Sequence, residues 1–75
     1  MYTISLDVSF DLSIGDFLEE VKKHHGSIKS IESNGVLGAP IANLTFPSIN
    51  EARAYVNQEY SPDMDPEENE ELYFN

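Results

Sequence analysis

Two neighbouring histidines, His24 and His25, are the first residues that could do chemistry, because imidazole binds metals and transfers protons near neutral pH. They are the only histidines of the chain. Adjacent side chains on a helix point about 100° apart, so they do not converge on one ion as an i, i+4 pair does. At the end of a predicted helix they instead complement the helix dipole. The sequence predicts no metal site and no cofactor.

Carboxylates are the second candidates for chemistry. Asp7 and Asp11 stand four residues apart on one face of a predicted strand, ~13 Å, which is too far for the paired carboxylates of a glycosidase. Gly15 lies in the first turn of a predicted helix without the further glycines of a phosphate-binding loop. The other residues supply no recognisable set of nucleophile, base and orienting group. The sequence therefore predicts a protein that is not an enzyme.

The charge of the chain is strongly negative and unevenly spread. Fourteen acids and four bases give the 75 residues a net charge of −10, and residues 61–75 hold six of the acids and no base. A protein that binds nucleic acid or an anionic membrane directly needs a basic surface, so both are disfavoured. The acidity favours a protein partner with a basic surface, such as a nucleic-acid-binding site. The alternative is that the charge only keeps the protein soluble.

The candidate partner-binding residues are acids of the first strand, the first helix and the end of the chain, together with the three apolar residues near that end. They are Asp7, Asp11, Asp16, Glu19, Glu20, Asp63, Asp65, Glu67, Glu68, Glu70, Glu71, Leu72, Tyr73 and Phe74.

The elements that must position these residues follow from the hydrophobic pattern. Residues 2–12 alternate strictly between apolar and polar, which predicts a half-buried strand. A helix follows, with Ser13 as N-cap, one apolar stripe that includes Phe17 and Val21, and Gly26 as a left-handed stop. Residues 27–33 predict a second, poorly patterned strand, because Ile28 and Ile31 fall on opposite faces of a regular strand.

The second half of the domain is also predicted to contain a strand followed by a helix. Residues 41–46 alternate again and predict a third strand. Ser48 and Glu51 form a capping box that begins a second helix, and Ser61-Pro62 ends it. Residues 1–60 are thus expected to form one α+β domain, a small ferredoxin-like fold of order strand, helix, strand, strand, helix. Without cysteines, a signal-peptide pattern or a long apolar run, a cytoplasmic location is expected.

The stretch from Ile4 to Asn57 resembles the small ligand-binding ACT domains and their ferredoxin-like relatives. The resemblance rests on Asp11 and Gly15 at the first strand-to-helix turn, the helix DFLEEVKKHHG, the strands SIKSIES and IANLTF, and the helix INEARAYVN. It implies a βαββαβ fold, side-by-side dimers and regulatory binding of an amino acid at the subunit interface, with Asp11, Ser13 and Gly15 near the ligand. Here the acid and the glycine are one residue further apart than is typical of that family. A purely structural dimer subunit is a third hypothesis.

Residues 61–75 are expected to form an acidic C-terminal tail, for which several readings stay open. Glu71 to Asn75 would form a short fourth strand that covers the edge of the first strand. The acids and prolines are also typical of a solvated, disordered segment. Alternatively, Leu72-Tyr73-Phe74 is a recognition peptide flanked by steering charges. The ending also resembles the processing site of expression tags, although Asn75 in place of glutamine favours native sequence.

Overall fold

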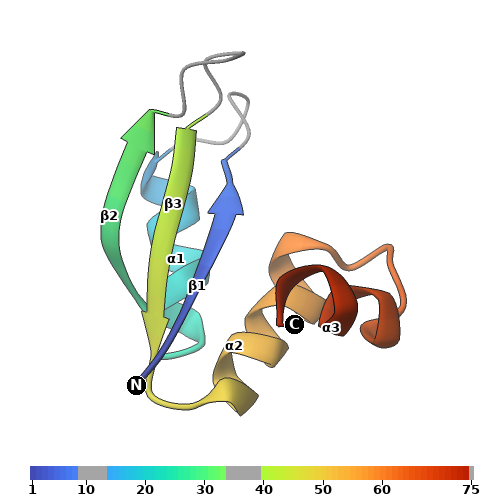
Figure 1. Ribbon diagram of the computed structural model, residues 1–75. Coiled ribbons are helices and arrows are strands. Elements are labelled where there is room, and N and C mark those ends of the chain that lie inside the picture. The colour runs from blue at the N-terminus through green and yellow to red at the C-terminus, as the bar shows by residue number, and fades with distance from the viewer. Residues whose placement is uncertain (9–13, 34–39, 75) are drawn as a thin grey trace.

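The computed structural model describes residues 1–8, 14–33 and 40–74 and shows a small α+β architecture (Figure 1). Three strands and three helices follow one another, the second helix continuing into a π-helical turn. In chain order they are β1 (Tyr2–Asp7), α1 (Ile14–Lys23), β2 (Ser27–Ser33), β3 (Pro40–Phe46), α2 (Ile49–Tyr55), η1 (Val56–Tyr60) and α3 (Pro66–Tyr73).

The three strands form an antiparallel sheet in the order β1-β3-β2. Because β3 lies antiparallel to both neighbours, β1 and β2 are parallel to each other, and α1 is the connection between them. Helices α1 and α2 contribute to one core on the same face of the sheet. The buried core residues are Ile4, Leu6, Val8, Phe17, Val21, Ala42, Leu44, Phe46, Ala52, Tyr55 and Val56.

The alternation predicted for the first strand is confirmed over its described part. Ile4 and Leu6 are buried, whereas Thr3, Ser5 and Asp7 are exposed. The third strand follows the same rule with every second residue buried. The predicted extension of the first strand to residue 12 lies outside the described residues.

A β-bulge corrects the expectation for the second strand. The pairing of β2 with β3 shifts around Lys29, so that Ile28 faces Leu44 and Ile31 faces Ala42. The extra residue changes the side-chain period, which brings Ile28 and Ile31 to the same face of the sheet. The two isoleucines therefore fit a strand better than strict alternation indicated.

The end of α1 also differs from the expectation, since the left-handed residue is His25 (φ 65°) and not Gly26. The His25 N–H donates to Lys22 O at 2.9 Å and the Gly26 N–H to Val21 O at 3.0 Å, the pattern of a Schellman motif. Gly26 is needed for a different reason. A Cβ at this position would lie 2.5 Å from Cε1 of Phe46, so the glycine allows the chain to turn against the core.

The capping residues of α2 form a different bond from the one expected. Ser48 has the extended backbone of an N-cap, but its hydroxyl donates to the Glu51 carboxylate at 2.9 Å and not to the helix backbone. The helix runs through η1 to Tyr60, and the Ser61 N–H donates to Val56 O at 2.8 Å. The predicted stop at Ser61-Pro62 is confirmed.

The fourth strand expected at residues 71–75 is wrong, because residues 66–73 form helix α3. Asp65 stands at the N-cap position and Pro66 at the start of the helix, where its fixed φ is favourable. Glu67 and Glu68 follow in the first turn, where carboxylates stabilise the positive end of the dipole. Within the described residues no further strand pairs with β1, so the full ferredoxin-like order is not observed.

No helix in residues 1–8, 14–33 and 40–74 is long and apolar enough to cross a bilayer.

Candidate functional site

Helix α3 is held against the domain by a buried amide. Asn69 is 1% exposed, and its Nδ2 donates to Oδ1 of Asn57 at 2.8 Å and to the carbonyl of Ser61 at 3.1 Å. Both acceptors belong to η1 or directly follow it. Two bonds from one buried side chain fix the rotation of α3 about its own axis, so one side of the helix must face the domain.

An ion pair ties the same helix to α2. Arg53 donates through Nε and Nη2 to the two carboxylate oxygens of Glu70, at 2.9 and 2.5 Å. This bidentate pairing lowers the pKa of Glu70 and raises the pKa of Arg53. Among the described residues, Glu70 is therefore an acid of the C-terminal segment whose charge is neutralised by a base of the domain.

Two of the three apolar residues near the C-terminus pack on the protein's own aromatic side chains. Tyr73 meets Tyr60 edge-on, with ring centroids 5.5 Å apart, and Phe74 stacks on Tyr2 at 5.8 Å. Leu72 points away and is 60% exposed. As a helix and not as a strand, the segment covers part of β1, and Leu72 is the residue of the three that is available to a partner without rearrangement.

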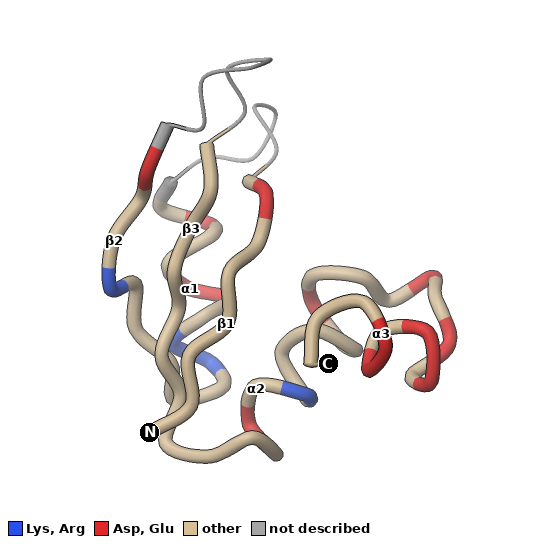
Figure 2. Tube along the Cα trace, viewed as in Figure 1, with Lys and Arg blue, Asp and Glu red and all other residues tan. Residues whose placement is uncertain are grey.

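Because the inner side of α3 is occupied, the other acids of this segment are exposed to solvent. Figure 2 shows the acidic positions along the loop and the helix at the end of the chain. We call these exposed acids the α3 acidic surface. It consists of Asp63, Asp65, Glu67, Glu68 and Glu71, all exposed. Residues 61–75 contain no base, so this surface is not neutralised from within the segment. The structure therefore brings together five of the predicted partner-binding carboxylates.

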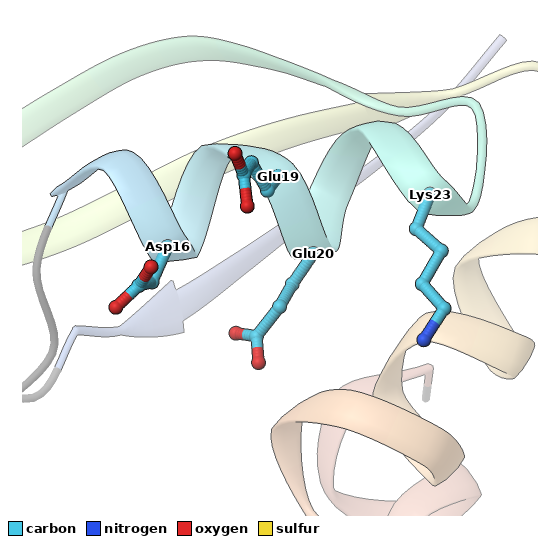
Figure 3. A pocket seen from close by; sticks show the side chains of 4 residues that line it. All are labelled: Asp16, Glu19, Glu20 and Lys23. Atoms are coloured by element: carbon cyan, nitrogen blue, oxygen red, sulfur yellow. The ribbon is translucent and has the colours of Figure 1, made fainter.

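The acids of α1 lie on a different part of the surface. Asp16, Glu19 and Glu20 line an open hollow of about 370 Å³ together with Lys23 (Figure 3). Partial burial is the main cause that raises the pKa of Glu20, followed by the carboxylates of Glu59 and Asp16. All four lining residues come from one helix, and the hollow is wide open to solvent. Such an arrangement presents charge but does not enclose a ligand.

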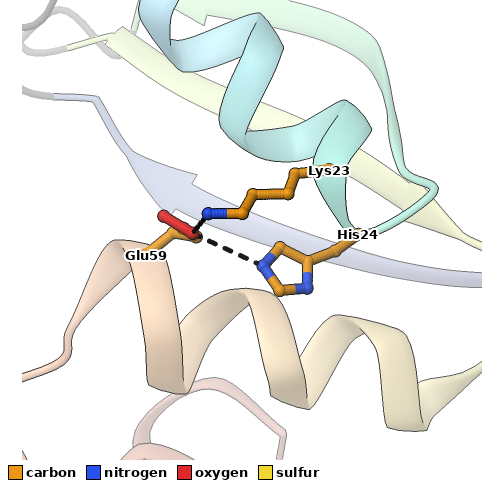
Figure 4. A network of polar contacts seen from close by, with 3 residues as sticks. All are labelled: Lys23, His24 and Glu59. Carbon is orange, nitrogen blue, oxygen red and sulfur yellow. Dashed lines mark hydrogen bonds and ion pairs between the residues drawn. The ribbon is translucent and has the colours of Figure 1, made fainter.

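A polar network at the end of α1 joins that helix to η1 (Figure 4). Lys23 Nζ donates to Glu59 Oε1 at 3.0 Å, and His24 Nε2 lies 3.7 Å from the same oxygen. The bond from Lys23 is the main cause that lowers the pKa of Glu59. The His24 ring packs edge-on against Tyr55 at 6.1 Å. His24 is thus a packing residue in addition to its predicted place at the helix end.

The two histidines diverge, since the His24 side chain is 11% exposed whereas His25 is exposed at the left-handed position. In the part of the chain that the structure describes, no three His, Asp or Glu side chains are grouped so as to hold a metal ion.

The remaining predicted residues are scattered. Asp7 is exposed at the end of β1, and its carbonyl accepts a hydrogen bond from the Tyr60 hydroxyl at 2.8 Å. Gly15 is exposed, and apart from its chain neighbours and the backbone of its own helix no described atom lies within 4 Å of where its Cβ would be. Asp11 and Ser13 lie outside the described residues. The residues that sequence reasoning missed are Asn69, Arg53 and Tyr60, which position α3. Of these, only Arg53 carried a signal, as the one base near the acidic segment.

Neither the protein-family models nor the curated proteins nor the solved structures compared with this chain include a match. The function must therefore be argued from the chemistry of its surfaces.

Proposed function

We propose that this protein is a non-catalytic binding module that uses the α3 acidic surface to occupy a basic site on a partner protein. A nucleic-acid-binding site is the kind of basic site that fits best, in which case the module acts as an inhibitor or adaptor. The observation that carries the proposal is the one-sided helix α3. Its inner side is fixed by Asn69 and Glu70, while five carboxylates within nine residues face outward.

Fixing the helix makes these charges more effective for binding. A disordered acidic tail loses conformational entropy when it binds, whereas a helix that is already docked has lost most of it beforehand. Glu67 and Glu71 are four residues apart, so their Cα atoms lie ~6 Å apart along the helix axis, on neighbouring turns. A row of like charges on a small body steers association with an oppositely charged surface.

The bases of the chain leave this surface negative. Arg53 is engaged with Glu70, and Lys23 with Glu59. Lys22 lies at the end of α1 and Lys29 on β2. In Figure 2 the basic positions on β2 and at the end of α1 lie away from the acidic loop and helix that end the chain, whereas the one on α2 lies beside α3. The charge asymmetry supports a partner that approaches from the α3 side.

A pull-down from cell extract tests the proposal. The bait is the chain itself, beside a variant in which Glu67, Glu68 and Glu71 are changed to Gln. We expect the native chain to capture basic proteins at low salt, raised salt to reduce that capture, and the triple variant to lose it. An oligonucleotide should then compete with the chain for the purified partner.

The matched control carries the same loss of three charges elsewhere, as Asp7→Asn, Glu19→Gln and Glu32→Gln. This control should keep most of the capture. If both triple variants lost it equally, net charge and not the α3 acidic surface would be responsible. Capture that does not depend on salt would contradict charge-led binding.

A further inference from the structure

The outer side of β2 is an uncovered edge of the sheet. In the order β1-β3-β2 this strand has one neighbour, and within the described residues nothing pairs with its other side. Ile31 is 43% exposed there, one of three large hydrophobic side chains of the described chain that face solvent. An exposed strand edge with an apolar side chain is a template for another strand.

The ladder shows which backbone groups of β2 point outward. The Val8 N–H donates to the carbonyl of Pro40 at 2.9 Å, so that carbonyl points toward β1. In an antiparallel ladder the direction alternates, so the backbone groups of Ile41 point toward β2 and bond to its partner Glu32. The next residue, Ile31, must then direct its N–H and C=O away from the sheet. Residue 31 therefore offers another strand both unpaired backbone hydrogen-bonding groups and an exposed apolar side chain.

The charge of this edge suits a second copy of the chain. Although the protein carries a net charge of −10, β2 contains one base, Lys29, and one acid, Glu32. In Figure 2 the acids of α3 lie on the side of the molecule opposite β2. Two copies that meet at β2 therefore keep their most acidic parts apart.

We propose that the β2 edge pairs with β2 of a second copy, antiparallel, with Ile31 facing Ile31 of the second copy. The pair at residue 31 forms two N–H···O=C bonds across the two-fold axis, and the two exposed isoleucines cover each other. Lys29 then faces residue 33 of the other copy and Ser30 faces Glu32, so no two like charges stand directly opposite. The result is a six-stranded sheet with α1 and α2 of both copies on one face.

Neighbouring registers are less favourable. Centring the pair on Glu32 would place two carboxylates directly opposite each other, which destabilises a strand pair. Centring it on Ser30 would put the bulged residue Lys29 directly beside the two-fold axis, whereas the proposed register keeps it two residues from the axis. A shift that pairs odd with even positions would set the polar face of one copy against the core face of the other.

Sedimentation velocity of the full chain over a wide range of concentrations tests the proposal. The native chain should form a dimer, and Ile31→Lys should weaken it by about thirtyfold or more, as loss of a central contact does. Ile31→Thr, which keeps a β-branched side chain, should weaken the dimer less and guards against a folding defect. The matched control is Leu72→Lys, the same kind of change at the exposed leucine of α3, which should leave the dimer intact.

Cysteine crosslinking tests the register, because the chain has no cysteine of its own. In the proposed register Ile31→Cys places two Cα atoms about 5.5 Å apart, within disulfide reach. Glu32→Cys places them more than about 7 Å apart, beyond that reach. Ile31→Cys should therefore crosslink under mild oxidation, and Glu32→Cys and Leu72→Cys should not.

Three outcomes would overturn the proposal. A native chain that stays monomeric at all concentrations would leave the β2 edge to a strand of another protein. Loss of the dimer in Leu72→Lys but not in Ile31→Lys would place the interface on α3. Equal crosslinking of all three cysteine variants would refute the register. Raised salt should strengthen this dimer by screening the net repulsion, opposite to its effect on the basic partner, so the two proposals fail independently.

Discussion

The two edge strands of the sheet, β1 and β2, differ in how far other parts of the protein cover them. At β1 the Tyr60 hydroxyl bonds to the outward carbonyl of Asp7, and Phe74 stacks on Tyr2. At β2 no described residue covers the edge, and Ile31 remains exposed. Natural proteins protect sheet edges because an open edge invites another strand. Helix α3 thus covers part of β1 and carries charge at the same time, whereas β2, uncovered within the described residues, is the edge at which we propose pairing.

The largest expected effect on stability comes from releasing α3 from the β1 edge. The substitution Asn69→Asp should do this. The new carboxylate would be buried next to the carbonyl of Ser61 without a positive partner, which costs about 3 kcal/mol. We expect α3 to detach, seen as faster amide hydrogen exchange in residues 66–73 at neutral pH. Protonation of the carboxyl at low pH should restore part of the protection.

Asn50→Asp is the matched control, because it makes the same chemical change at an exposed position in the first turn of α2. Its effect should stay within about 0.5 kcal/mol. If both variants exchanged alike, Asn69 would not be what holds α3 on the domain.

A smaller effect is expected from Tyr60→Phe, which keeps the ring and removes the hydroxyl. The bond to the Asp7 carbonyl contributes about 1 kcal/mol or less, since that carbonyl can bind water instead. Urea unfolding at neutral pH measures this loss. The amide exchange of residues 66–73 should stay as slow as in the native chain, because α3 remains docked. Faster exchange there would contradict this division of roles.

Tyr60 also gives the covered edge a dependence on alkaline pH. Burial, the main cause, raises its pKa from the ordinary 10 to about 12. The folded state holds the phenol proton more tightly, so its contribution is complete below pH 10 and is lost as the pH rises from 10 to about 12. Tyr60→Phe should flatten the stability curve in this window. Burial also raises the pKa of Tyr55, so some dependence should remain.

The ion pair of α3 predicts a dependence on acidic pH. The pKa of Glu70 lies below its ordinary 4.5 because of Arg53, so the stabilisation is present above pH 4.5 and is lost as the pH falls through the lowered pKa. The effect should be small because both side chains are partly exposed. Thermal unfolding of Glu70→Gln from pH 7 to pH 3 should show a flatter curve than the native chain.

Two other glutamates help to interpret that curve. Lys23 lowers the pKa of Glu59, which adds a dependence of the same sign, whereas the raised pKa of Glu20 acts in the opposite direction. Glu67→Gln, on the outer side of α3, is the control for the loss of one charge. If the thermal stability of Glu70→Gln fell between pH 7 and pH 3 as steeply as that of Glu67→Gln, Arg53 would not stabilise α3 through this pair.

The elements that sequence predicted well are those whose pattern is local. The strict alternation of residues in β1 predicted a strand, and the apolar stripe through Phe17 and Val21 predicted a helix, as the structure shows. The bulge at Lys29 could not be predicted, because it is defined by the pairing of β2 with β3, which sets Ile28 against Leu44 and Ile31 against Ala42. In that case tertiary packing determined the register, not the local pattern.

The candidate site was predictable in composition but not in arrangement. The acids of residues 61–75 are evident in the sequence, and the three consecutive apolar residues favoured a strand there. The helix signal, Asp65-Pro66 followed by glutamates, was present and outweighs them. What sequence cannot show is that Asn69 faces inward, because a single asparagine among glutamates has no signature until its partners in η1 are known.

The smallest effect on the monomer is expected at the uncovered edge itself. Ile31→Thr should change the free energy of unfolding by no more than about 0.5 kcal/mol when measured at low protein concentration, because the side chain is exposed and threonine is a good strand residue. The same variant measured at high concentration should be less stable than the native chain, since it loses the stabilisation that self-association adds. Stability that depends on concentration in the native chain and not in the variant would place that contribution at β2. A loss above about 1 kcal/mol at low concentration would instead mean that Ile31 belongs to the core of the monomer, and the contrast between the two edges would disappear.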